Sequence, residues 1–299
     1  MNQLSEPTIN NEEVFENVAQ SKTYKNDHCK KCSIMQKDCK VCSYGNRGKM
    51  LNLKDKVFQR YQFYFQNKNT LHEIRPIKMM NPDEVQLMED SYKTSKVFQT
   101  VKKQLLDNVP KERRGVCPFC MISEPTTMDH YFSESEYPEY IIFAPNLVPC
   151  CSHCNSVKGK RLFLKNEGEI KRTVIHFYYD VLPQTKYLKS TFYVTDKIPQ
   201  ISFWLEFENE TEITGIIKKH FETLHLLERY RERSNGILST ECENIRVCLV
   251  NGFSVKDCVK LLRCKAQSSE KIFGRNYWEA CIYRAMSESE DQLMKLVEN

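Results

Sequence analysis

The sequence predicts an α+β fold in which a short cysteine-rich segment joins a helical N-terminal region to a C-terminal region of strands and helices. Apolar residues recur at helical spacing over 50–66 and 82–107, whereas short stretches between 172 and 207 alternate apolar and polar residues as strands do. Between these regions, two Cys-x-x-Cys pairs lie about thirty residues apart. Such pairs can staple a segment that is too short to build its own core.

The composition is that of a globular protein with reduced cysteines. The chain has 299 residues and a net charge of +5, and no segment approaches the apolar length that spans a bilayer. The acidic N-terminus is unlike a signal peptide, so the fourteen cysteines favour a reducing, cytoplasmic setting without a membrane. Residues 21–66 hold eleven basic against three acidic side chains, and 156–172 hold six against two. This distribution indicates either a polyanionic partner or a solvated basic face, with equal weight.

The N-terminal region divides into three predicted segments. Residues 1–20 have four acids and no base, which predicts a loosely ordered acidic arm. Residues 21–48 predict a zinc knuckle or, alternatively, a flexible arm with reduced thiols. Its four candidate ligands are Cys29, Cys32, Cys39 and Cys42. Residues 49–112 predict a helical region, including a helix capped by Asn81 that runs to about Asp107.

The central segment, 113–165, contains a second set of four cysteines with stronger metal-site spacing. Cys117 and Cys120 form one pair, and Cys151 and Cys154 form the other. Two such turns complete a closed tetrahedral site, so we expect a structural zinc ion there. Cys150 does not fit the Cys-x-x-Cys spacing of the second pair, so it is interpreted as a neighbour of the zinc site and not as a ligand.

Polar residues beside these cysteines suggest phosphodiester chemistry. His130 has an imidazole suited to a general base, and Asp129 and Asn155 offer oxygen ligands for magnesium or manganese. Asn146 is expected to orient His130. Three basic side chains are expected to hold the backbone of a nucleic acid, namely Lys158, Lys160 and Arg161. Singly, each polar residue more often satisfies a turn; together, around the cysteines, they favour catalysis.

The order Cys-Pro-x-Cys, Asp-His, Asn-Leu-Val-Pro and Cys-x-x-Cys-Asn-x-x-Lys-Gly resembles the HNH endonucleases that carry a four-cysteine zinc clamp. The resemblance covers about fifty residues and implies a ββα-metal finger. One strand would end at Asp129 and His130, a second would lie around 146–148, and a helix would carry Asn155 and Lys158. By motif position His130 matches the general base, Asn146 its support, and Asp129 and Asn155 the metal-binding positions.

Two further stretches, 133–140 and 176–180, add a weaker likeness to bacterial HNH proteins that act with ATPases in phage defence, such as Septu-like systems. Ser133 departs from this likeness, because many relatives have proline at that position. Within 166–299 we expect strands at 172–180, 190–195 and 200–207, then helices, which together form a possible docking domain for such a partner.

The leading hypothesis is therefore a metal-dependent HNH endonuclease that cleaves nucleic acid, with DNA favoured over RNA. One alternative is a zinc-containing nucleic-acid-binding protein or interaction subunit without catalysis. The other is an RNA-directed nuclease.

Overall fold

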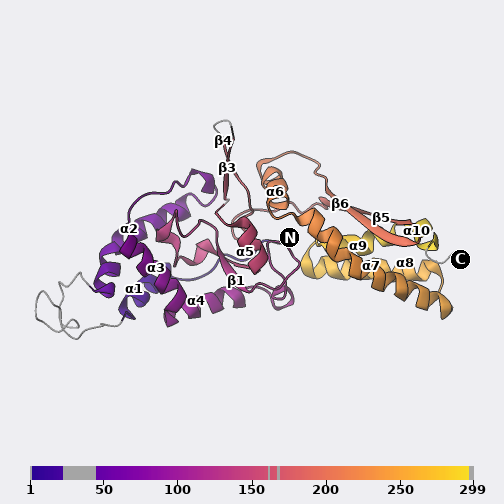
Figure 1. Cartoon of the computed structure of the whole chain (residues 1–299), viewed down its shortest axis with the longest axis horizontal. Coiled ribbons are helices and arrows are strands. Elements are labelled where there is room, and N and C mark those ends of the chain that lie inside the picture. The colour runs from indigo at the N-terminus through magenta and orange to yellow at the C-terminus, as the bar shows by residue number, and fades with distance from the viewer. Residues whose placement is uncertain (1, 23–44, 161, 167–168, 296–299) are drawn as a thin grey trace, which may run out of the picture.

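The computed structural model describes residues 2–22, 45–160, 162–166 and 169–295. The molecule is elongated, with the N-terminal helices at one end and the C-terminal helices at the other (Figure 1). Its described part is mostly helical, with three two-stranded sheets, so the α+β class is confirmed. The predicted knuckle cysteines Cys29, Cys32, Cys39 and Cys42 lie outside the described residues. No helix of the described part combines the length and apolar character needed to cross a membrane.

The N-terminal half is a bundle of four helices around one apolar core. The helices are α1 (Asn11–Gln20), α2 (Asn46–Gln66), α3 (Pro82–Thr94) and α4 (Lys96–Asp107). The expectation of a loosely ordered arm over 1–20 is wrong, because α1 buries Phe15 and Val18 completely in this core. Asn10 caps α1 by accepting a hydrogen bond from the backbone of Glu13.

The helix predicted from Asn81 to Asp107 breaks at Ser95. Asn81 caps the helix as predicted, in a capping box with Glu84, but Ser95 is extended, with ψ of 120°. Its hydroxyl accepts a hydrogen bond from the backbone of Phe98 and so caps a second helix, α4. The break lets Lys102 of α4 donate to the carbonyl of Tyr92 in α3, at 2.8 Å.

The central segment is a β-hairpin followed by a short helix. β1 (Thr127–His130) pairs antiparallel with β2 (Leu147–Cys150), which places Asp129 opposite Val148. Short 3₁₀ turns lie in the intervening loop, and α5 (Ser152–Lys158) follows. Leu147 is buried in the N-terminal core and Val148 in the C-terminal core, because neighbouring strand residues face opposite sides. The hairpin is therefore a wall shared by both cores.

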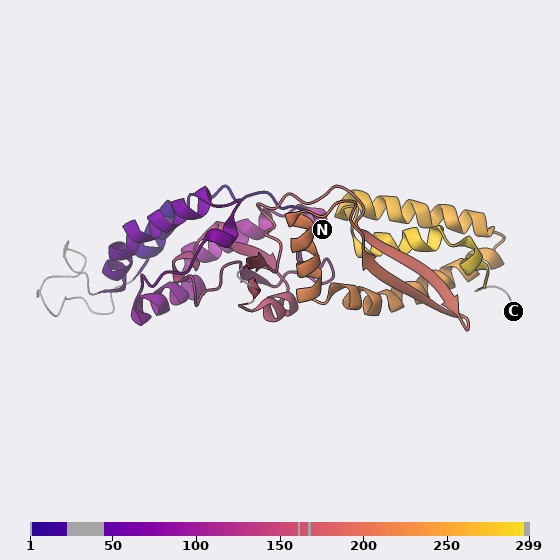
Figure 2. The ribbon, with the colours of Figure 1, turned by 90° about the horizontal axis from the view of Figure 1, so that it is seen from above.

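The C-terminal half packs one hairpin against a group of helices. β5 (Leu188–Thr195) and β6 (Ile198–Leu205) form the hairpin, which lies along α7 and α9 (Figure 2). The helices are α6 (Glu212–Thr223), α7 (Leu226–Val250), α8 (Val255–Phe273), α9 (Trp278–Ser287) and α10 (Glu290–Lys295). The strands predicted at 190–195 and 200–207 thus correspond to β5 and β6.

The strand predicted at 172–180 is wrong. A small hairpin of β3 (Phe163–Asn166) and β4 (Glu169–Arg172) ends there, and 173–180 continues as an irregular segment. Val174 is buried in the N-terminal core and Ile175 in the C-terminal core. The alternation that suggested a strand reflects burial between two cores without a pairing partner.

Candidate functional site

The four central cysteines form a compact cluster. The sulfur atoms of Cys117, Cys120, Cys151 and Cys154 all lie within 4.8 Å of one another, and all four residues are buried. The Cys151 side chain also accepts a hydrogen bond from the backbone N–H of Cys154, and this bond caps the N-terminus of α5. Burial raises the pKa of the Cys117 thiol, so the cluster would need a cation to become fully ionised. The donor set and spacing fit a metal ion such as zinc.

The first Cys-x-x-Cys turn is held by three helices of the C-terminal half. Three consecutive carbonyl groups of this turn accept hydrogen bonds from side chains of α6, α7 and α9. The pairs are Phe119 with His220 (2.8 Å), Cys120 with Tyr230 (3.0 Å) and Met121 with Trp278 (2.9 Å). The metal-capable cluster is thus built into the C-terminal core, and the predicted boundary at 165/166 does not separate it from residues 166–299.

His130 ends β1 and is 8% exposed. Its Nε2 lies 2.9 Å from the carbonyl oxygen of Ile141, and its Nδ1 lies 2.9 Å from Oε1 of Glu134. The ring of Tyr92 packs against it, with centroids 4.6 Å apart. A carbonyl only accepts hydrogen bonds, so Nε2 carries a hydrogen. Both ring nitrogens face accepting oxygens, and neither presents a lone pair to water in this arrangement.

Asn146 makes no side-chain hydrogen bond to His130, which corrects its expected role. Its amide oxygen accepts a hydrogen bond from the backbone of Phe132 at 2.8 Å. Its amide nitrogen donates to the carbonyls of Phe132 and Tyr140, at 3.1 and 3.2 Å. Asn146 is fully buried and closes the loop between β1 and β2, so it acts on His130 only through that backbone.

Lys158 is part of a buried ion pair, not a surface contact for nucleic acid as expected. It is 1% exposed and Asp129 is 2% exposed. Lys158 Nζ lies 3.0 Å from Oδ1 and 2.9 Å from Oδ2 of Asp129, and it donates to the carbonyl of His130 at 2.8 Å. Lys158 follows the buried Cys154 by one helical turn, so α5 directs both inward. Lys160 is exposed, whereas Arg161 lies outside the described residues.

The expected divalent-ion site at Asp129 and Asn155 does not fit the described arrangement. Oδ2 of Asp129 is buried and accepts no well-aligned hydrogen bond, but the Lys158 ammonium already neutralises this carboxylate. The Asn155 side chain is half-buried and makes no hydrogen bond within the described part of the chain. Among the described residues, the only cluster of three or more cysteine, histidine or acidic ligands is the four-cysteine one.

Glu134, Tyr92 and Lys102 surround His130 but are not candidates from the sequence. Lys102 Nζ lies 3.3 Å from the centre of the Tyr92 ring. Burial lowers the pKa of Lys102 to about 8, and the nearby Glu134 opposes this shift. The hydrogen bond from His130 is the main cause of a lowered pKa at Glu134. No periodic or motif signal connects these residues, because the break between α3 and α4 brings Lys102 to Tyr92, whereas Glu134 reaches His130 from the loop between β1 and β2.

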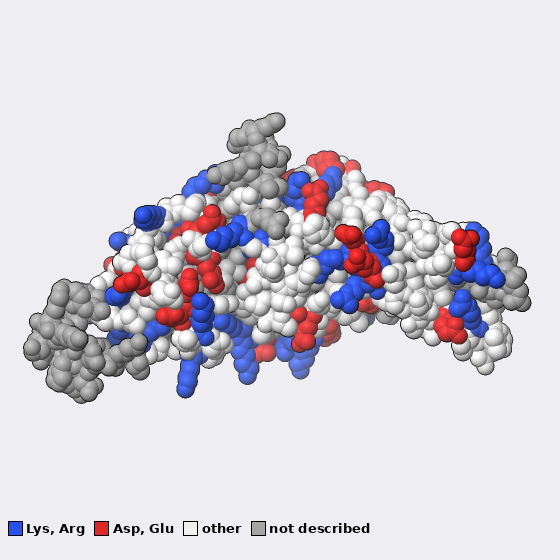
Figure 3. Space-filling view, in the orientation of Figure 1, with Lys and Arg blue, Asp and Glu red and all other residues white. Residues whose placement is uncertain are grey.

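The described basic residues near the N-terminus do not form an unopposed patch. Basic and acidic side chains are mixed over the face in Figure 3. Three basic residues of α2 pair with acids of neighbouring segments. The pairs are Lys49 with Asp83, Lys54 with Glu16, and Arg60 with the buried Glu139. Much of the positive charge predicted over 21–66 belongs to residues outside the described part.

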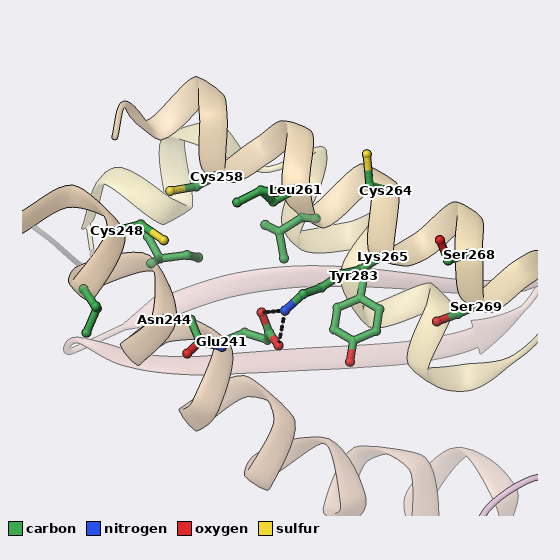
Figure 4. A pocket seen from close by; sticks show the side chains of 13 residues that line it. Glu241, Asn244, Cys248, Cys258, Leu261, Cys264, Lys265, Ser268, Ser269 and Tyr283 are labelled. Atoms are coloured by element: carbon green, nitrogen blue, oxygen red, sulfur yellow. Dashed lines mark hydrogen bonds and ion pairs between the residues drawn. The ribbon is translucent and has the colours of Figure 1, made fainter. Parts of the chain in front are cut away.

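A separate cavity of about 650 Å³ lies among α7, α8 and α9, far along the chain from His130. Glu241 and Lys265 pair inside it, at 2.7 and 2.6 Å (Figure 4). Its walls are mainly apolar and include Val247 and Leu261, which are half exposed. The shape is that of a groove between helices.

Comparison with known proteins gives one distant relative. Protein ea31 of Escherichia phage lambda is 26% identical over 190 residues, covering 58% of this chain and 62% of ea31. The chain thus spans less than two thirds of the length of this curated relative. No protein-family model matches the chain, and no solved structure matches it.

Proposed function

We propose that the chain is an HNH-type endonuclease in which His130 is the general base. The observation that supports this most directly is the fixed His130 ring at the end of β1, beside a hairpin and helix joined to a four-cysteine cluster. This is the placement that the resemblance to HNH endonucleases implies. Zinc would be structural, because four cysteines leave no open coordination position.

In this proposal the proton-accepting role belongs to Nδ1 of His130. Nε2 is committed to the carbonyl of Ile141, which fixes the tautomer and the ring plane. Once Glu134 moves away, Nδ1 would first release to solvent the proton that it shares with this carboxylate. Nδ1 would then take a proton from a water molecule as the oxygen of that water attacks phosphorus. The bond from phosphorus to the leaving oxygen then breaks, and that oxygen acquires a proton from solvent.

The resemblance adds a magnesium or manganese ion at Asp129 and Asn155. Since Lys158 holds Asp129, no step is derived through that ion, and a strict requirement for it would mean that Lys158 leaves the carboxylate during turnover. DNA as the favoured substrate and a role in phage defence with an ATPase partner belong to the same proposal. The groove among α7, α8 and α9 supports a docking role because of its apolar, accessible walls.

The test is cleavage of labelled DNA and RNA by the purified protein with magnesium, manganese or EDTA. We expect His130→Ala to reduce cleavage by about 10²-fold or more, the usual contribution of a general base. His153→Ala is the matched control, because His153 is exposed on α5. Equal activity of wild type and His130→Ala, or no cleavage with any ion or partner, contradicts the proposal. Salt-sensitive binding that is independent of His130 would instead favour the non-catalytic alternative.

A further inference from the structure

Glu134 occupies the reactive side of His130. Its Oε1 lies 2.9 Å from Nδ1, the nitrogen that the bond to Ile141 leaves for chemistry. A water molecule hydrogen-bonded to Nδ1 and in contact with a substrate phosphate would need this same position. The carboxylate and this water molecule therefore exclude each other at Nδ1.

Of the two partners, Glu134 is the one that is able to move. Its side chain is 34% exposed, and its residue lies in a turn closed by the hydrogen bond from Tyr137 to the carbonyl of Ser133, at 2.9 Å. His130 is held on three sides by Ile141, Tyr92 and the β1–β2 pairing. Rotation of one surface side chain would open the site without unfolding the hairpin.

The surroundings of the Glu134 carboxylate are positive. Besides His130, the ammonium groups of Lys93 and Lys102 lie close enough to favour its charged form. Lys102 is anchored over the Tyr92 ring, whereas Lys93 is mostly exposed and pairs with Glu89 at 3.2 Å. If Glu134 withdraws, these cations lose a nearby carboxylate. A phosphate group, with its negative charge and accepting oxygens, suits the place of that carboxylate.

We propose that Glu134 is a built-in plug, whose carboxylate takes the place of the water that would link Nδ1 of His130 to a substrate phosphate, and that it must rotate out before a phosphodiester binds. This inference rests on the proposed function and adds a means of regulation to it. An incoming phosphate would repel the carboxylate and compete for the same cations, so substrate itself would release the plug.

The test measures binding separately from cleavage. A fluorescent single-stranded DNA oligonucleotide is titrated in EDTA with wild type, Glu134→Gln and Glu134→Ala, and inorganic phosphate is used as competitor. We expect both variants to bind about tenfold more tightly, since loss of one opposing charge near the surface is worth roughly that factor. Adding His130→Ala to Glu134→Ala should remove most of the gain. Glu136→Gln is the control, because it makes the same charge change two residues away in the same turn.

Unchanged or weaker binding by both Glu134 variants, or an equal gain for Glu136→Gln, overturns the plug. Thermal unfolding of each variant checks that the fold is retained. The two proposals fail separately. Tighter binding by the Glu134 variants without His130-dependent cleavage would support the plug and contradict the nuclease proposal. His130-dependent cleavage without tighter binding by these variants would support the nuclease proposal and contradict the plug.

Discussion

At the scale of single residues, the buried pair of Asp129 and Lys158 sets the character of the site. Both side chains are almost completely inaccessible, and desolvation raises the pKa of Asp129 even with the lysine alongside. Removing one member would leave the other charge buried without a partner. Such a loss is far more costly than removal of an exposed ion pair.

We therefore expect Lys158→Ala to lower the free energy of unfolding by about 3–5 kcal/mol. The double variant Asp129→Asn with Lys158→Met should recover most of this loss, because it removes both charges and keeps the volume. Denaturant unfolding of the two variants measures the difference. Lys160→Ala is the control at an exposed position, expected within about 0.5 kcal/mol of wild type. A Lys158→Ala protein as stable as the control would show that the pair is open to solvent.

The sequence predicted which residues come together here but not how they pair. The spacing of the cysteines predicted their cluster, and the resemblance to HNH endonucleases implied that Asp129 and His130 end a strand of the adjoining hairpin, as observed. The direction of Lys158 was not predictable, since α5 has only seven residues and is too short for an apolar period to define its inner face. Glu134 reaches His130 through a loop, where sequence spacing says little about side-chain direction.

At the scale of elements, His220 ties three segments together. From α6 its Nε2 donates to the carbonyl of Phe119 at 2.8 Å, and its Nδ1 accepts from the backbone of Ile175 at 3.3 Å. Both bonds require the neutral ring with its hydrogen on Nε2. Burial lowers the pKa of His220 to about 4, against an ordinary value near 6.5.

This shift predicts a loss of stability in mild acid. The unfolded chain binds a proton near pH 6.5 and the folded one near 4, so the stabilisation is complete above about 6.5 and falls as pH drops toward 4. The full contribution is on the order of 3 kcal/mol. His176, also buried with a lowered pKa, acts in the same direction. Urea midpoints at several pH values measure this decline.

His220→Gln provides the comparison, because its amide can both donate and accept but does not titrate. It should lose less stability than wild type between pH 7.5 and 5, while acid effects on the cysteine cluster are common to both. Parallel pH curves for the two proteins would exclude His220 as a cause.

Element boundaries were the least predictable part of the fold. Apolar periodicity continues through Ser95 and through Leu224, yet α3 ends before Ser95 and α7 begins after His225. Ser95 caps the following helix, and His225 adopts a left-handed conformation with φ of 52°. Apolar periodicity indicates which face of a segment is buried, but it does not indicate whether one helix continues through the segment. Such breaks are set by tertiary contacts, which the sequence pattern does not show.

At the scale of the whole molecule, the cysteine cluster is an inseparable part of the C-terminal core. Its first turn is capped by α6, α7 and α9, and its second continues from a strand shared with the N-terminal core. A local motif of about fifty residues could not indicate this, because the covering side chains come from 220 to 278. The central segment is thus not expected to fold independently.

A fragment of residues 1–187 tests this directly. It keeps all the cysteines of the cluster but lacks His220, Tyr230 and Trp278. The carbonyls of the first turn would therefore lose their hydrogen-bond donors, and the apolar residues around the cluster would be exposed to water. We expect the fragment to unfold without cooperativity and to hold much less than one zinc per chain, whereas the full chain holds at least one. Metal analysis and circular dichroism measure both properties. Cys154→Ser in the full chain should abolish zinc binding at this cluster, so any zinc that remains would belong to the cysteines at 29–42. A stable fragment that binds zinc would contradict this expectation. It would show that the cysteine cluster forms without the C-terminal helices.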